Sequence, residues 1–182
     1  MRSLTLVNAL PSGFVFEGAM PPELLDMMSA AARGDTAAVS ELQIRIWFDG
    51  PARVPSSLGG VELEARAEAS RMNRLFVERG TFAIADAVPK DPLTPPAARR
   101  LGEIHVPTLV VSGALDYAEN RRASKLLADG IPGARLTVMD DCAHVPPLEA
   151  AESFSAMLAS FIEEIAADPH CLSIDVFSPL QD

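Results

Sequence analysis

Residues 106–116 read Val106-Pro107-Thr108-Leu109-Val110-Val111-Ser112-Gly113-Ala114-Leu115-Asp116. After the proline the run is almost continuously apolar and rich in β-branched side chains until Ser112-Gly113 ends it. A run without polar alternation is typical of a strand buried on both faces of a parallel sheet. This stretch therefore predicts the α/β class, with helices flanking a parallel sheet.

The neighbouring segments alternate between helix and strand. Residues 121–129 have a helical pattern that Gly130 and Pro132 end, and residues 134–139 are β-prone. Residues 150–166 place apolar side chains at helical spacing. With the short β-prone run Leu4–Val7, this order predicts about three mostly parallel strands joined by right-handed crossovers.

The stretch between the first strand and residue 106 has a different pattern. It contains three predicted helices, over residues 21–34, 36–48 and 61–78, with Asp35 as the N-cap of the second. Residues 86–100 are rich in proline and are expected to form a semi-rigid connector back to the sheet.

Two polar residues occupy loops where an open parallel sheet places its reactive groups. Asp116 follows the strand at 106–112, and His144 follows the strand at 134–139. Both loops are expected at the same edge of the sheet. A carboxylate beside an imidazole is the arrangement in which the acid orients a histidine base and stabilises its charged form.

Simpler interpretations of these residues stay open at this point. Asp116 is also suited to capping a helix, and His144 to an ordinary loop position. Cys142, two residues before His144, is interpreted as a small buried residue rather than as a replacement nucleophile.

Other conspicuous side chains are assigned structural roles. Trp47 is interpreted as helix packing in preference to a ligand contact, although it lies where a helix could roof a pocket. His105 and His170 lack partners at metal-ligand spacing and are expected at the surface.

Composition excludes several classes of protein. The 182 residues include 25 acidic and 15 basic side chains, giving a formal charge of −10, so no basic surface for nucleic acid is expected. Two cysteines, Cys142 and Cys171, are too few for a disulfide scaffold. No apolar run approaches the roughly 20 residues of a membrane span, and the protein is expected to be soluble and cytoplasmic.

Three segments together resemble the carboxyl-terminal part of the α/β-hydrolase fold family, and they occur in the family's order and at its usual spacing. They are residues 106–116, residues 131–136 (Ile-Pro-Gly-Ala-Arg-Leu) and residues 142–149 (Cys-Ala-His-Val-Pro-Pro-Leu-Glu). The opening, residues 2–8, is similar to the strand that precedes the family's helical cap. The resemblance covers about residues 2–166, and is strongest to esterases, enol-lactonases and hydrolases of carbon–carbon bonds.

The resemblance implies both an organisation and a site. Residues 1–13 would form the first strand and loop, 14–98 the helical cap and 99–167 the rest of the core, leaving 168–182 as a tail without a functional account. Asp116 would be the triad acid and His144 the general base, acting on a small-molecule substrate. No cofactor and no metal are implied.

The serine nucleophile of the family has no counterpart in the printed sequence. No two of its eleven glycines lie four positions apart, so it contains no Gly-x-Ser-x-Gly, and the nearest lookalike, at 55–59, follows no strand. The chain alone is therefore expected to be inactive. A glycine-rich turn for a nucleotide is also missing after the first strand.

Three expectations follow from the missing nucleophile. Leu4–Val7 would be an exposed sheet edge, which a complementing chain or a second copy would cover. Alternatively, the reading frame begins upstream of Met1. The competing functional hypothesis is a non-catalytic binding or interaction remnant of a hydrolase.

Overall fold

The computed structural model describes residues 2–54, 56, 58–80 and 93–167. The predictions for the tail, for His170 and Cys171, for part of the lookalike motif at 55–59 and for residues 86–92 of the connector lie outside these residues. The elements are β1 (Leu4–Val7), α1 (Pro22–Ala32), α2 (Thr36–Ile44), the π-helix η1 (Arg45–Asp49), α3 (Gly60–Glu78), the 3-10 turns η4 (Ala97–Arg99) and η5 (Leu101–Glu103), β2 (Thr108–Gly113), α4 (Ala118–Gly130), β3 (Arg135–Met139), α5 (Pro146–Glu149) and α6 (Ala151–Ala167).

Within the described residues, the sheet has three strands in the order β1-β2-β3, and both pairings are parallel. This confirms the predicted class and topology. Every residue of β2 is buried, as the apolar run at 106–113 predicts for a central strand. Among the strands that the structure describes, β1 pairs only with β2 and is therefore one edge of this sheet.

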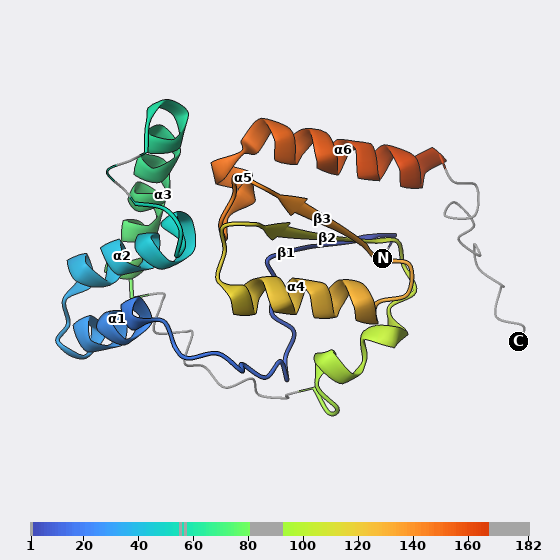
Figure 1. Ribbon diagram of the computed structural model, residues 1–182, viewed down its shortest axis with the longest axis horizontal. Coiled ribbons are helices and arrows are strands. Elements are labelled where there is room, and N and C mark those ends of the chain that lie inside the picture. Colours follow the sequence, from blue (N-terminus) through green and yellow to red (C-terminus); the bar gives the residue numbers. More distant parts are fainter. Residues whose placement is uncertain (1, 55, 57, 81–92, 168–182) are drawn as a thin grey trace, which may run out of the picture.

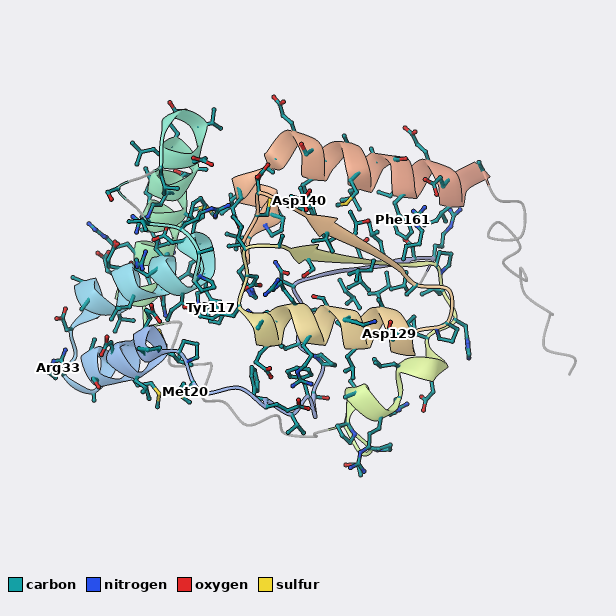
Figure 2. All side chains as sticks on the ribbon, viewed as in Figure 1. Met20, Arg33, Tyr117, Asp129, Asp140 and Phe161 are labelled. Carbon is teal, nitrogen blue, oxygen red and sulfur yellow. The ribbon has the colours of Figure 1, made fainter. Side chains whose placement is uncertain are left out.

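Helices cover both faces of the sheet, α6 on one side and α4 on the other (Figure 1). Val110 packs with Leu127 and Ile131 on the α4 side. Its neighbours Leu109 and Val111 pack with Phe161 and Ile165 on the α6 side. Successive side chains of a strand point to opposite faces, so β2 supplies both halves of the core. Figure 2 shows Phe161 between α6 and the sheet.

Helices α1, α2 and α3, with η1, form a separate group that we call the three-helix unit. It lies beyond the carboxyl ends of the strands (Figure 1). Asp35 caps α2 as predicted, because its carboxylate accepts a hydrogen bond from the backbone N–H of Ala38 at 3.0 Å. Val39 of α2 packs against Ala30 and Val77, which joins all three helices.

The helix predicted over residues 36–48 is present, but its hydrogen-bond pattern changes from α to π after Ile44. The backbone widens there into η1, which ends at Gly50 with a positive φ of 67°. A Cβ on Gly50 would lie 2.6 Å from the carbonyl oxygen of Leu115, so glycine permits the close contact between η1 and the loop after β2.

A buried ion pair holds η1 against α3. The Asp49 side chain is fully buried and accepts hydrogen bonds from Arg66 Nε at 2.9 Å and Nη2 at 3.0 Å. These bonds raise the pKa of Arg66 above its ordinary value. The pair fixes the end of η1, and with it the position of Trp47.

No helix in the described part of the chain is long and apolar enough to cross a membrane.

Replacement of Leu109 by alanine tests the two-sided core. Leu109 is 2% exposed, so Leu109→Ala should lower the free energy of unfolding by about 2–5 kcal/mol. Leu136→Ala on β3 is the matched control, because Leu136 is 41% exposed and should lose less than about 1 kcal/mol. Urea unfolding followed by circular dichroism measures both, and equal losses would contradict a core centred on β2.

Candidate functional site

Asp116 lies in the loop between β2 and α4 and is 1% exposed. Its Oδ1 accepts hydrogen bonds from the backbone N–H of Tyr117 at 2.7 Å and from Asn120 Nδ2 at 2.8 Å. Its Oδ2 lies 2.7 Å from Nδ1 of His144. Both carboxylate oxygens are therefore satisfied, which is the condition for burying an ionised acid.

His144 lies in the loop after β3, with its side chain 23% exposed. A carboxylate can only accept, so the contact with Asp116 places the proton of the neutral ring on Nδ1. Nε2, on the opposite edge of the ring, keeps its lone pair and is free to take a proton. The contact between the two residues is the one the sequence predicted, although they are 28 positions apart.

Asn8 joins the ends of the strands beneath this pair. It follows β1, is 4% exposed and has a positive φ of 43°. Its Nδ2 donates to the carbonyl oxygens of Ala143 at 3.0 Å and His144 at 2.9 Å, and its Oδ1 accepts from Gly113 N–H at 3.1 Å. One amide therefore fixes the His144 loop to both β1 and β2. The sequence analysis did not predict this role, although an asparagine directly after a strand is a residue that tolerates a positive φ.

Glu149 of α5 holds the same loop from the other side. Its Oε2 accepts from Ala143 N–H at 2.6 Å and its Oε1 from Val145 N–H at 2.8 Å, so the carboxylate brackets His144. Arg53 donates to Glu149 at 2.5 Å and also to the carbonyl oxygen of Asp141. The side chains of Glu149 and Arg53 are 2% and 11% exposed. No pattern in the sequence predicts this anchor.

Gly113 allows the two loops to touch. A Cβ at this position would lie 1.8 Å from the carbonyl oxygen of Ala143. No side chain fits without moving the backbone of the His144 loop. The glycine that ends the β2 run therefore belongs to the geometry of the site.

Trp47 forms a wall of the site, so the pocket-lining alternative applies to it beside the preferred interpretation as helix packing. Its ring lies against His144, with centroids 4.7 Å apart, and its carbonyl oxygen accepts the backbone N–H of His144 at 3.1 Å. It lines two mainly apolar cavities, one of about 360 Å³ that includes His144 and one of about 410 Å³ that includes Tyr117 and Asn120. Figure 2 shows Tyr117 between α4 and the three-helix unit.

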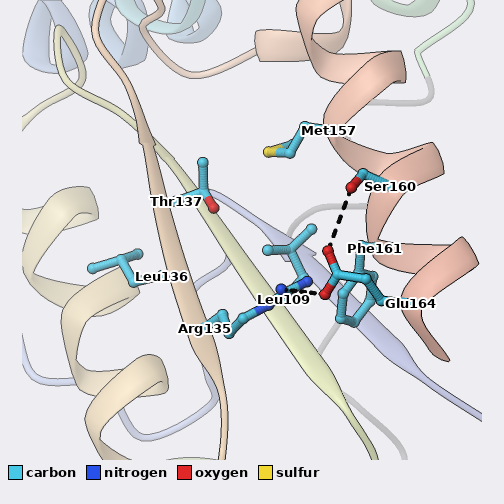
Figure 3. Close-up of a pocket in the computed structure, with 8 residues that line it drawn as sticks. All are labelled: Leu109, Arg135, Leu136, Thr137, Met157, Ser160, Phe161 and Glu164. Atoms are coloured by element: carbon cyan, nitrogen blue, oxygen red, sulfur yellow. Dashed lines mark hydrogen bonds and ion pairs between the residues drawn. The ribbon is translucent and has the colours of Figure 1, made fainter. Parts of the chain in front are cut away.

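A third cavity, of about 480 Å³, is unrelated to this site. It lies between α6 and strands β2 and β3 and contains neither Asp116 nor His144 (Figure 3). Arg135 and Glu164 form an ion pair of 2.6 Å there, and both side chains are about half exposed.

Cys142 is buried, at 1% exposure, as the sequence predicted. Burial raises the pKa of its thiol to about 11, so the thiol keeps its proton at neutral pH. A protonated, buried thiol is a poor nucleophile. His105 is exposed, also as predicted. Among the described residues, no group of three His, Cys, Asp or Glu side chains could hold a metal ion.

The Asn8 anchor is tested by Asn8→Gly, which tolerates the positive φ and removes only the side-chain hydrogen bonds. Leaving the buried Gly113 N–H unpaired should lower the free energy of unfolding by about 1–3 kcal/mol in urea titrations. An unchanged value would show that these three hydrogen bonds do not stabilise the fold.

The Cys142 thiol predicts a pH dependence of stability. An unfolded thiol titrates near pH 8.5, whereas the folded thiol keeps its proton to about pH 11. The folded state then binds more protons, so stability should fall as pH rises through this window. We expect the free energy of unfolding of Cys142→Ala to fall less steeply than that of the wild type between about pH 8.5 and 10.5. If the two proteins lose stability in parallel over this range, the pKa of the Cys142 thiol is not raised by folding.

The chain is similar in sequence to parts of known hydrolases. No protein-family model matches the chain. The chain is 37% identical over 73 residues to a pimeloyl-[acyl-carrier protein] methyl ester esterase of Neisseria meningitidis, covering 40% of this chain and 23% of the esterase. It is 28% identical over 162 residues to 2-hydroxy-6-oxononadienedioate/2-hydroxy-6-oxononatrienedioate hydrolase of Klebsiella pneumoniae, covering 89% of this chain and 54% of that hydrolase.

Solved structures agree on the fold. The chain superposes on Est816, an N-acyl homoserine lactone degrading enzyme, with a TM-score of 0.61 and 26% identity over 87% of this chain and 57% of Est816. For the enol-lactonase from Burkholderia xenovorans the TM-score is 0.57 at 23% identity, over 88% of this chain and 56% of the lactonase. The chain thus spans 23% to 54% of the two curated relatives named above. Its parallel sheet, its flanking helices and the solved structures on which it superposes together show that the chain has the α/β-hydrolase fold.

Proposed function

We propose that this chain is the cap and carboxyl-terminal catalytic part of a serine-type hydrolase that cleaves ester or lactone bonds. Hydrolysis of a carbon–carbon bond is the alternative reaction that the sequence resemblance implies. The observation that carries the proposal is the 2.7 Å contact between Asp116 Oδ2 and His144 Nδ1, beside a mainly apolar cavity of about 360 Å³ that His144 lines. Such a pair, with Nε2 free, is the base half of a nucleophilic triad.

In the proposed reaction, a serine hydroxyl attacks the substrate carbonyl carbon while Nε2 of His144 takes its proton. Asp116 stabilises the imidazolium that forms and holds the ring in place. Nε2 then returns the proton to the leaving oxygen, and water repeats the sequence on the acyl-enzyme. The contacts of Asn8 and Glu149 with the His144 loop keep Nε2 in one position throughout.

We assign residues 14–98 as the cap and residues 1–13 and 99–167 as the core portion, and residues 168–182 stay without a functional account. The three-helix unit supports this division, because it packs over the His144 loop through Ile44 and Phe48. The substrate would then bind between cap and core, along Trp47. The two cysteines favour the cytoplasm as the compartment.

The proposal requires a serine from outside the printed sequence, because that sequence contains no Gly-x-Ser-x-Gly. We propose that the strand bearing it pairs with the free edge of β1. A longer polypeptide or a complementing chain would both supply such a strand, and self-association through β1 is the competing use of that edge.

The second candidate function is a binding protein that has lost the chemistry. The missing nucleophile motif favours it, and so does the survival of two mainly apolar cavities along Trp47. The two candidates differ in whether the protein turns a substrate over through His144 or only binds it.

An activated-ester assay separates them. The chain alone should hydrolyse p-nitrophenyl butyrate no faster than buffer. Expressed in frame with the coding sequence upstream of Met1, it should turn the ester over, and His144→Ala should lower kcat by about 10³-fold or more. His105→Ala, an exposed histidine, is the control. Turnover by the extended protein that survives His144→Ala would contradict the proposal, and no turnover would favour the binding protein.

A further inference from the structure

Gln43 is a buried amide without a partner in the part of the chain that the structure describes. It lies on α2 and is 1% exposed, and among the described residues neither its Nε2 nor its Oε1 has a hydrogen-bond partner. Among the described residues, the other buried side-chain atoms in this condition are the hydroxyl oxygens of Ser112 and Ser124. An unpaired buried amide destabilises a fold, so its presence calls for a reason.

The surroundings of Gln43 point to a ligand. It lines the cavity of about 360 Å³ that also contains His144. The rest of the wall is mostly apolar, and it includes Trp47, Met72 and Phe76. Asn73, the other amide on the wall, already donates to Ser40 O and Oγ at 3.1 Å. One unpaired polar group in an apolar cavity is the pattern by which binding sites fix the orientation of a ligand.

We propose that Gln43 is a specificity-determining residue whose amide pairs with a neutral donor–acceptor group at one end of an apolar ligand. Oε1 accepts and Nε2 donates, so full pairing requires a donor and an acceptor side by side, as in a primary amide or a lactam. A carboxylate, a ketone or an ester offers only acceptors and leaves Oε1 unpaired. The aliphatic part of the ligand lies along Trp47 and Met72.

The position of Gln43 places the donor–acceptor group of the ligand in the same cavity as the proposed base, His144. Gln43 and His144 line the same cavity, so a ligand held at Gln43 extends toward the base. This step rests on the proposed function, whereas the binding preference itself does not require turnover. Binding and catalysis are therefore tested separately.

The test uses a pair of ligands that differ in one group. Hexanamide carries the amide, and 2-heptanone is its isostere with a methyl in place of the amino group. Trp47 is the one tryptophan of the sequence and lines the cavity, so its fluorescence reports binding of either ligand to the printed chain. The measured quantity is the ratio of the two dissociation constants.

We expect Gln43→Met to reduce the preference for hexanamide over 2-heptanone by at least about fivefold relative to the wild type. Met72→Ala is the matched control on the same wall, and it should weaken both ligands equally because it removes only apolar contact. Gln43→Leu repeats the test if the methionine variant does not fold. An unchanged ratio in a folded variant, or no binding of either ligand to the wild type, would overturn the proposal.

A stability measurement excludes a purely structural role. If Gln43 has no partner within the protein, Gln43→Met should raise the midpoint of thermal unfolding in the absence of ligand. A lowered midpoint would mean that Gln43 is paired inside the fold, which overturns the proposal. Neither the ratio of dissociation constants nor the unfolding midpoint depends on ester hydrolysis. The proposed hydrolase function can therefore fail while the role of Gln43 in binding is supported, and the role of Gln43 can fail while the hydrolase function is supported.

Discussion

The hydrogen bond between Asp116 Oδ2 and His144 Nδ1 is the interaction around which the rest of the site is arranged. It joins loops that follow two different strands, at a heavy-atom distance of 2.7 Å. A charged acceptor buried at 1% exposure is stable only if its environment supplies donors, and Tyr117 N–H and Asn120 Nδ2 supply them. The pair therefore depends on the start of α4 as much as on the two residues themselves.

The surrounding structure limits the freedom of the His144 loop. Asn8 binds its carbonyl oxygens, and Glu149 binds the N–H groups on both sides of the histidine. Gly113 leaves room for this loop, and η1 presents the Trp47 ring to the imidazole. Such fixed positioning lowers the reorganisation that a proton transfer would require. These contacts hold the imidazole of His144 in one orientation, with Nδ1 toward Asp116 and Nε2 directed away from it.

The sequence predicted those parts that depend on local pattern. The apolar run ending at Gly113 identified the central strand, and loops after parallel strands brought Asp116 and His144 together. The anchors were missed because their contacts join residues far apart in sequence: Asn8 is 135 positions from Ala143, and Arg53 is 96 from Glu149. The π-helix η1 was not predicted because its residues fit an α-helix equally well. The lack of a hydrogen-bond partner for the Gln43 amide among the described residues can be recognised only when the surrounding structure is known.

The tautomer of His144 is the most direct test of this account, and it can be measured on the chain without turnover. Long-range ¹H–¹⁵N NMR distinguishes a neutral ring protonated at Nδ1 from one protonated at Nε2. If Asp116 orients the base, the spectrum should show His144 with its proton on Nδ1 in the wild type, and this preference should be lost in Asp116→Asn. The same tautomer in both proteins, or an Nε2-protonated ring in the wild type, would contradict the claim that the carboxylate sets the state of the histidine.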